Sequence, residues 1–319
     1  MHKRFVNHCT ITLTIAPDGP ILIKSGKEGA DPTKPSMEFV ETYHQGGRTI
    51  YLPGSSLKGA IRAHAERIVR TIGSEKYKKD DDKHLWASDP LQLNDYDYLK
   101  DYSQTSDIYK WSSFTDQMFG STAIASRIRI EDAYPVDRTQ LKLEERNGVA
   151  IDRVFGSVAV GPFNYQVCTS GAFRTKIHLK NFTLAQLGLI GLVLRDLNDG
   201  WFGIGFAKSR GLGTVAVNYE KAVVHYPTCI LDQETQKIVP LGSSKAPWDY
   251  TTLLGVGAFL EDDERDRYGF PRDDQQDTPV GAQEMPLGLG VQLTWQSNTV
   301  TDLFERAVRA WRIRLEVTG

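Results

Sequence analysis

A short polar segment early in the chain has side chains suited to holding a phosphate group. Residues 53–62 read PGSSLKGAIR, so a chain-breaking Pro-Gly pair precedes the polar side chains of Ser55, Ser56, Lys58 and Arg62. Backbone N–H groups at the start of a helix attract anions, and the two cations add positive charge. GxxxxGK[ST] is absent, which excludes a Walker A loop. The alternative is an ordinary capped helix with surface cations.

A second cationic segment is rich in glycine. Residues 203–213 read GIGFAKSRGLG, in which four glycines flank Lys208, Ser209 and Arg210. Glycines allow a backbone to approach closely, and the two cations favour contacts with phosphates. The segment follows a predicted helix and precedes a strand, whereas a dinucleotide fingerprint needs the reverse order. The alternative is a flexible loop.

A third segment, Asn147–Arg153, lies inside a region that we expect to form a long hairpin. Ile151 or Val154 could wedge against a base while Arg153 meets a phosphate. The alternative is a plain hairpin in which Asp152 and Arg153 form an ion pair.

Asp31 is the candidate catalytic carboxylate, and it lies in a Gly- and Pro-bearing loop. A carboxylate there could orient a 2′-hydroxyl or bind a divalent cation, and the alternative is a turn-forming aspartate. His44 and His64 are the nearest histidines, and we expect His64 in the core. Neither a Ser-His-Asp nor an HExxH pattern occurs.

The composition is that of a globular protein. The 319 residues are 40% hydrophobic with a formal net charge of −2, which excludes wholesale disorder, collagen and coiled coil. Three cysteines without a CxxC pair disfavour a disulfide framework or a structural zinc site, and they fit a reducing cytoplasm. No apolar run reaches the length of a membrane span.

The elements that position these segments follow a βαββαβ order. The predicted elements are strand Val6–Ile15, helix Leu57–Ile72, strand Ala125–Ala133, strand Ala172–Leu179, helix Leu184–Leu197 and a strand from Thr214. A serine caps the first helix and Thr183 caps the second. In the strand Ala125–Ala133, Arg127, Arg129 and Glu131 are predicted to point outward. This order predicts an α+β, ferredoxin-like (RRM-like) fold, whose four-stranded sheet is a common platform for RNA.

The predicted domain organisation has two parts. Residues 1–223 form the ferredoxin-like part, with an insertion at 75–116 and a projecting hairpin at 134–171. Residues 224–319 form a C-terminal extension of unassigned role, in which Val300–Leu315 is predicted to be a helix with Trp311 on its apolar side.

These segments resemble, in order, those of the RAMP superfamily of CRISPR-associated proteins, and more narrowly the crRNA-binding backbone (nuclease) subunit of type III effector complexes. Residues 53–62 resemble the family's first helix, and Phe119–Ser121 followed by Ser126–Ile128 resembles its next strand. Asn147–Arg153 resembles its thumb, and Gly203–Gly213 its glycine-rich loop. The four segments occur in the family's order and together span about two-thirds of the chain.

The resemblance implies a palm-like subunit that stacks with others along a crRNA, while each thumb displaces one base and the guide pairs with target RNA. Its implied partners are crRNA, target RNA and other subunits of a type III complex, in the cytoplasm. The residues implied to bind RNA are Ser55, Ser56, Lys58, Arg62, Arg127, Arg153, Lys208, Ser209 and Arg210.

The resemblance also implies an endoribonuclease. Asp31 matches by placement the aspartate that cuts target RNA, with Mg²⁺ or Mn²⁺ assisting attack of a 2′-hydroxyl to leave a 2′,3′-cyclic phosphate. Glu38 and Glu41 are rival carboxylates in the same long loop. Two alternatives stay open: a scaffold subunit without chemistry, and a guide-processing endoribonuclease with His44 as its base.

Overall fold

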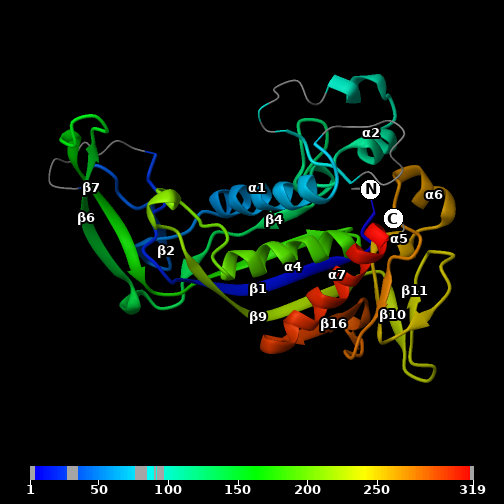
Figure 1. Cartoon of the computed structure of the whole chain (residues 1–319). Helices are drawn as coiled ribbons and strands as arrows, with labels where there is room; N and C mark the ends of the chain where they lie inside the picture. The colour runs from blue at the N-terminus through cyan, green and yellow to red at the C-terminus, as the bar shows by residue number, and fades with distance from the viewer. Residues whose placement is uncertain (1–3, 27–34, 76–84, 90, 92–96, 317–319) are drawn as a thin grey trace.

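The computed structural model describes residues 4–26, 35–75, 85–89, 91 and 97–316 (Figure 1). Its centre is an antiparallel sheet in the strand order β15-β16-β9-β1-β8-β4, with β5 also paired to β8. The strands are β1 (His8–Pro17), β4 (Ile128–Ile130), β5 (Tyr134–Pro135), β8 (Phe173–Lys180), β9 (Val215–Tyr226), β15 (Gln283–Glu284) and β16 (Val291–Gln296). The protein is therefore a mixed α+β protein built on antiparallel pairing.

The last four strands of this order, β9, β1, β8 and β4, follow the expected ferredoxin-like topology. Helix α1 (Gly54–Ile72) lies between β1 and β4 in the chain, and α4 (Leu184–Asn198) lies between β8 and β9. Since β1 sits between β8 and β9 in the sheet, with β4 beyond β8, the four strands have the spatial order of a βαββαβ unit.

Helix α4 is buried between its neighbours. Thr183 and Gln186 form a capping box at its start, as the sequence predicts for Thr183. Helix α7 (Val300–Glu316) packs along α4 at two glycines, because a Cβ at Gly188 would lie 2.7 Å from the carbonyl oxygen of Ala307 and one at Gly191 would lie 2.7 Å from Phe304. Trp311 of α7 is 3% exposed, which confirms its predicted apolar position.

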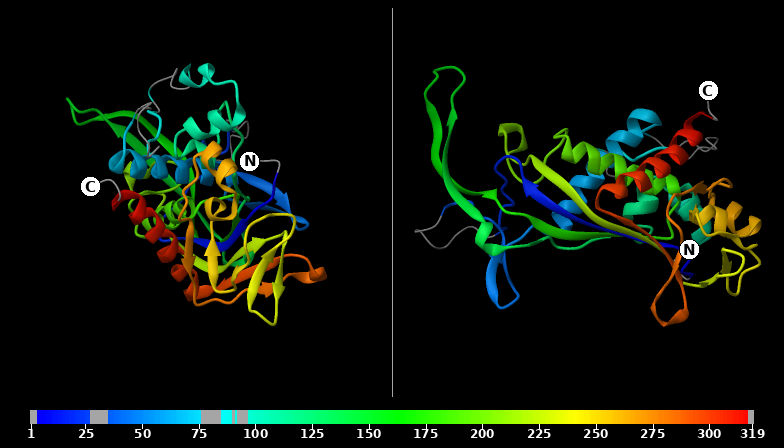
Figure 2. Two further views of the ribbon diagram at one scale, coloured as in Figure 1. Left: turned by 90° about the vertical axis from the view of Figure 1, so that its right-hand side faces the viewer. Right: turned by 90° about the horizontal axis from the view of Figure 1, so that it is seen from below.

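The two faces of the sheet differ. In β1, Cys9, Ile11, Leu13 and Ile15 are buried toward the helices, whereas His8 and the threonines between them are only half-buried. Figure 2 shows α1, α4 and α7 on one side of the sheet, with the hairpin of β2 (Glu41–His44) and β3 (Gly47–Ile50) projecting on the other. No helix of the described chain covers that second face, which we call the open face.

A long hairpin extends away from the sheet (Figure 1). Its strands are β6 (Lys142–Ile151) and β7 (Val158–Ser170), which pair antiparallel. Both lie within the region 134–171 for which the sequence predicts a hairpin. The side chains at the far end of the hairpin are exposed.

The remaining elements lie at the opposite end of the sheet (Figure 1). In the insertion they are a short helical turn (Asp97–Asp101) and α2 (Thr105–Trp111), and α3 (Asp116–Phe119) begins at its last residue. After β9 they are β10 (Cys229–Asp232), β11 (Lys237–Pro240), β12 (Trp248–Asp249), β13 (Thr252–Leu254), α5 (Val256–Phe259), α6 (Asp262–Tyr268) and β14 (Gln275–Asp277). Among the helices of the described residues, none combines the length and apolar character that a bilayer crossing needs.

Candidate nucleic-acid interface

The glycine-rich loop is held in one conformation by the segment that follows β1. The N–H of Phe206 donates to the carbonyl of Leu22 at 2.7 Å, and that of Gly213 donates to Pro20 at 2.9 Å. Gly205 has a φ of +79°, and a Cβ there would lie 2.2 Å from the Leu22 carbonyl oxygen, so only glycine fits. Both sides of the loop are thus anchored to residues 20–22.

The tip of this loop presents two cations and a hydroxyl to solvent. Lys208, Ser209 and Arg210 form one helical turn between Ala207 and Gly211, both of which have positive φ angles. All three side chains are exposed, and the guanidinium of Arg210 lies 5.4 Å from the ring centroid of Phe206. An exposed pair of cations on a fixed backbone is suited to phosphate contacts.

Helix α1 begins one turn earlier than the sequence predicts. It starts at Gly54 rather than Leu57, so Ser55 and Ser56 lie exposed in its first turn and no side chain of the preceding residue caps it. The carboxylate of Asp132 caps it instead, accepting from the Gly54 N–H at 2.7 Å. A carboxylate therefore occupies part of the end that was predicted to attract phosphate.

The cations of α1 have partners inside the protein. Lys58 donates to the hydroxyl of Ser126 at 2.8 Å, and burial, with Arg62 as a lesser cause, lowers the pKa of Lys58. Arg62 pairs with Glu66 and with Asp116, each at 2.7 Å. Two carboxylates therefore hold the guanidinium of Arg62 within the fold, a role that the sequence alone did not indicate, and its contact with a phosphate stays a prediction.

Arg127 is a core residue, and its prediction as an outward RNA contact is wrong. It is 2% exposed, donates to the carbonyl of Asn181 at 2.7 Å, and lies 4.0 Å from the ring centroid of Tyr109. Burial lowers the pKa of Arg127. The predicted alternation of outward and inward side chains does not hold at Arg127, because strand β4 begins only at the next residue, Ile128.

The turn of the β6–β7 hairpin exposes apolar side chains. The carboxylate of Asp152 accepts from the N–H groups of Val154 and Phe155, both at 2.8 Å, and these bonds lower the pKa of Asp152. Asp152 thus orders the turn through the backbone instead of pairing with Arg153, which is exposed. Val154 is 81% and Phe155 84% exposed. Phe155 was missed by sequence reasoning, although an aromatic next to a turn-forming aspartate was the available signal.

Three of the singled-out segments meet at one end of the molecule. The N–H of Ile21 donates to Cys168 of β7 at 2.9 Å, next to the Leu22 carbonyl that holds the glycine-rich loop. Ile23 accepts from Val40 at 2.9 Å, and Val40 accepts from Tyr51 at 3.4 Å, just before α1. Figure 1 shows the hairpin, the loop after α4 and the start of α1 at the same end.

Asp31 lies outside the described residues. The flanks of its loop are close together, since the N–H of Ser25 donates to the carbonyl of Glu38 at 2.9 Å and the hydroxyl of Ser36 donates to Asn164 of β7 at 2.7 Å. Glu41 pairs with Arg48 at 2.6 Å. Within the described ranges, no group of three or more His, Cys, Asp or Glu side chains could hold a metal ion.

The two histidines have different surroundings. His64 is 8% exposed and its Nε2 lies 2.8 Å from Asp196, which confirms the predicted core position. The ring of His44 stacks on Tyr134 with centroids 3.7 Å apart.

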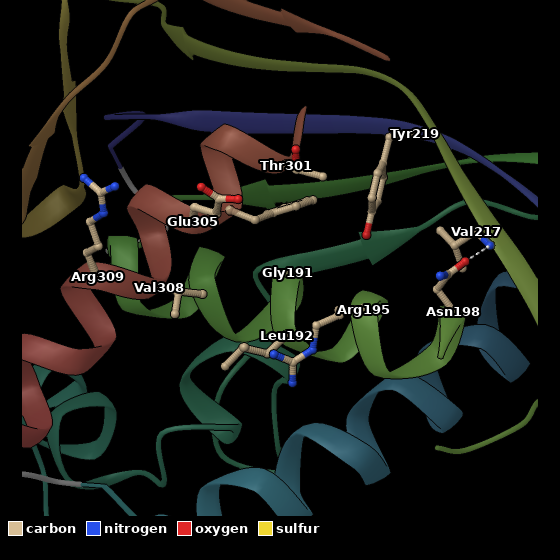
Figure 3. Close-up of a pocket in the computed structure, with 11 residues that line it drawn as sticks. Gly191, Leu192, Arg195, Asn198, Val217, Tyr219, Thr301, Glu305, Val308 and Arg309 are labelled. Carbon is tan, nitrogen blue, oxygen red and sulfur yellow. Dashed lines mark hydrogen bonds between the residues drawn. The ribbon is translucent and has the colours of Figure 1, made fainter. Parts of the chain in front are cut away.

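A groove of about 570 Å³ lies between α4, α7 and β9 (Figure 3). Arg195, Tyr219 and Glu305 are among its lining residues, and burial, with the negative charge of Asp199, raises the pKa of Tyr219 to about 12. The residues that line this groove include none of the predicted RNA contacts, so it is a separate feature.

The fold and these surfaces define an α+β protein with a basic glycine-rich loop beside a projecting hairpin. The sequence matches the family model of the RAMP superfamily over residues 14–216, and the chain belongs to this superfamily of CRISPR-associated proteins. Proteins of this superfamily typically bind crRNA within CRISPR complexes. No curated protein matches the chain.

Proposed function

We propose that this protein is a crRNA-binding backbone subunit of a type III CRISPR effector complex that also cleaves guide-paired target RNA. The observation that carries the proposal is the exposure of Lys208 and Arg210 on a fixed loop, at the end of the molecule where the β6–β7 hairpin begins. Exposed Lys and Arg side chains bind a sugar–phosphate strand through its phosphates and position it on the protein.

In this proposal the central sheet and its helices act as a palm and the β6–β7 hairpin as a thumb. The exposed Val154 and Phe155 would push between successive nucleotides and displace one base, while Arg153 meets a phosphate. Base pairing then reads the target sequence, and the protein reads backbone and shape. The partners are crRNA, target RNA and neighbouring subunits of the complex.

The proposed reaction is cleavage beside a displaced target nucleotide. The 2′-hydroxyl gives its proton to solvent as its oxygen bonds to the adjacent phosphorus, and the bond from phosphorus to the 5′-oxygen breaks. The departing 5′-oxygen takes a proton from solvent, so the products carry a 2′,3′-cyclic phosphate and a 5′-hydroxyl. Asp31, with RNA phosphate oxygens, would hold the Mg²⁺ or Mn²⁺ whose charge stabilises the transition state. A displaced nucleotide is able to reach the in-line geometry that this attack requires.

The test is Asp31→Ala in the assembled complex, with Glu38→Ala as the matched carboxylate control. We expect RNA of uniform length to co-purify with both variants, whereas one set of target cuts disappears only with Asp31→Ala. Unchanged cutting by Asp31→Ala would remove this residue from the mechanism and favour the scaffold alternative. Cutting of precursor repeat RNA by the purified chain alone would favour the guide-processing alternative.

A further inference from the structure

The open face of the sheet carries a row of titratable side chains along β8. Arg174, Lys176, His178 and Lys180 occupy alternate positions, opposite in direction to the buried Phe173, Thr175, Ile177 and Leu179. Residues two apart on a strand lie about 6.6 Å apart. The spacing between these basic side chains is therefore comparable to the spacing between successive phosphates in an extended polynucleotide.

The neighbouring strands extend this row across the sheet. Thr12 of β1 pairs with Lys176 of β8 on one side and with Lys221 of β9 on the other. One step along, Thr10 pairs with His178, which in turn pairs with Arg129 of β4. Thr12 therefore lies between two lysines, whereas Thr10 lies between Val223 and His178, whose Nδ1 is 3.2 Å from the Thr10 hydroxyl. Hydroxyl and ammonium groups both donate hydrogen bonds to phosphate oxygens.

The charge of this face is only partly compensated. Arg129 pairs with Glu131 at 3.2 Å, the Nε2 of His178 lies 2.8 Å from the same carboxylate, and Arg174 pairs with Glu220 at 2.9 Å. Across the residues that the structure describes, no carboxylate lies within ion-pair distance of Lys176, Lys180 or Lys221. These three lysines leave the open face positive in a chain whose net charge is −2.

A polar cavity of about 680 Å³ adjoins the row. Its lining includes the rings of His44 and Tyr134, the cations Arg129, Arg174 and Lys176, and the carboxylates Glu131 and Asp132. It lies beside the β2–β3 hairpin, which projects on this side of the sheet (Figure 2). A cavity of this volume is large enough for a nucleotide.

We propose that the open face is a second RNA-binding surface, which holds a single-stranded RNA segment by its phosphates and one nucleotide in the adjoining cavity. It goes beyond the proposed function, because this face lies across the sheet from α1 and α4 (Figure 2). A protein partner would need exposed apolar or aromatic side chains at its centre. The rows described above present Thr, Lys, Arg and His instead, and for that reason RNA is the occupant the chemistry favours.

The test measures the affinity of the purified full chain for a fluorescein-labelled oligouridylate over a range of salt concentrations. The test variant is Lys176→Ala/Lys221→Ala, and the matched control is Lys237→Ala/Arg267→Ala, which removes two exposed cations from β11 and α6. We expect the test variant alone to bind about ten-fold more weakly, with a salt slope smaller by about 1.4, because each phosphate contact to a single strand contributes about 0.7.

Parallel measurements on Lys208→Ala/Arg210→Ala separate this inference from the proposed function. If Lys176→Ala/Lys221→Ala binds RNA as tightly as the wild-type chain, the open-face proposal is overturned. An open face that binds a protein instead of RNA would give this same result. Guide binding by the glycine-rich loop is judged separately, from Lys208→Ala/Arg210→Ala. If only Lys176→Ala/Lys221→Ala loses affinity, the open-face proposal is supported and the proposed RNA contacts of Lys208 and Arg210 are contradicted. In the wild-type chain, a 4-thiouridine oligonucleotide should cross-link to residues 173–180; cross-links confined to residues 203–213 would also overturn it.

Discussion

The guanidinium of Arg62 on α1 donates to the carboxylate of Asp116 at the start of α3, with Nη2 2.7 Å from Oδ1. Asp116 is 1% exposed, and its second oxygen accepts from the hydroxyl of Ser113 at 2.8 Å. The ion pair therefore joins the first helix to the insertion across 54 residues of chain. A cation that looked like an RNA contact in the sequence holds two parts of the fold together.

Arg62→Ala should destabilise the protein. The substitution leaves the Asp116 carboxylate buried without its cation, and we expect the free energy of unfolding to fall by about 2–3 kcal/mol. Urea denaturation measures this loss. Arg67→Ala, on an exposed position of the same helix, is the control and should change stability by less than about 0.5 kcal/mol. Equal effects of the two substitutions would contradict the structural role of Arg62.

Lys208→Ala/Arg210→Ala should weaken guide binding without altering sequence preference. Both cations are exposed and act on phosphates, so the slope of log affinity against log salt should fall by about 1.4 for a single-stranded guide. Filter binding at several salt concentrations measures the slope. The arginine-lysine exchange Lys208→Arg/Arg210→Lys keeps both charges and should keep most of the affinity. An unchanged slope in the alanine variant would argue against contacts at this loop.

Val154→Ser/Phe155→Ser should abolish the displacement of bases while the fold survives. Both side chains are more than 80% exposed at the turn, so their removal costs little stability, whereas a hydroxyl cannot replace an apolar wedge between bases. Chemical probing of guide bases in the assembled complex should lose its periodic reactive nucleotides. Val160→Ser, on the stem of the same hairpin, is the control. Persisting periodic reactivity would exclude the turn as the wedge.

Gly205→Ala should be far more harmful than Gly211→Ala. Both glycines have positive φ angles, which cost an alanine about 1 kcal/mol. Only at Gly205 would the added Cβ collide with backbone, 2.2 Å from the Leu22 carbonyl oxygen, since nothing lies within 4 Å at Gly211. Thermal unfolding should show a larger drop in Tm for Gly205→Ala. Equal drops would mean that the loop is not held against Leu22.

The stability of the protein should fall on acidification through His8. Burial, followed by repulsion from His178 and His225, lowers the pKa of His8 from 6.5 to about 4. Between these values the unfolded chain binds a proton that the folded protein excludes, so stabilisation present above pH 6.5 is lost toward pH 4. After allowance for solvent screening, we expect about 1 kcal/mol between pH 7 and 5. His8→Gln should remove this component, and identical pH profiles for both proteins would contradict it.

Local sequence signals predicted local structure well. The helix after Thr183 follows from a threonine, a glutamine three residues later and an apolar run, all within one stretch of chain. The strand predicted at Val6–Ile15 is present as β1, His8–Pro17, and its apolar residues Cys9, Ile11, Leu13 and Ile15 are the buried ones, because a strand with one covered face has only two sides.

Features that depend on distant residues were not predictable in the same way. The cap of α1 comes from Asp132 instead of an adjacent serine, and the burial of Arg127 depends on Tyr109 and Phe270. None of these partners is marked by spacing, since each is brought in by tertiary packing. Residue types alone therefore overestimated how many cations are available to RNA.

The pairing of β16 with β9 has a consequence for dissecting the protein. Strand β9 runs to Tyr226, and its outer edge is covered along Lys221–Tyr226 by β16, while α7 covers the glycine-lined flank of α4. Cutting the chain after residue 223 would expose both an unpaired strand edge and an apolar flank of α4. Exposed strand edges and apolar patches together favour aggregation. The last hundred residues thus protect the solubility of the first two hundred, whatever else they contact.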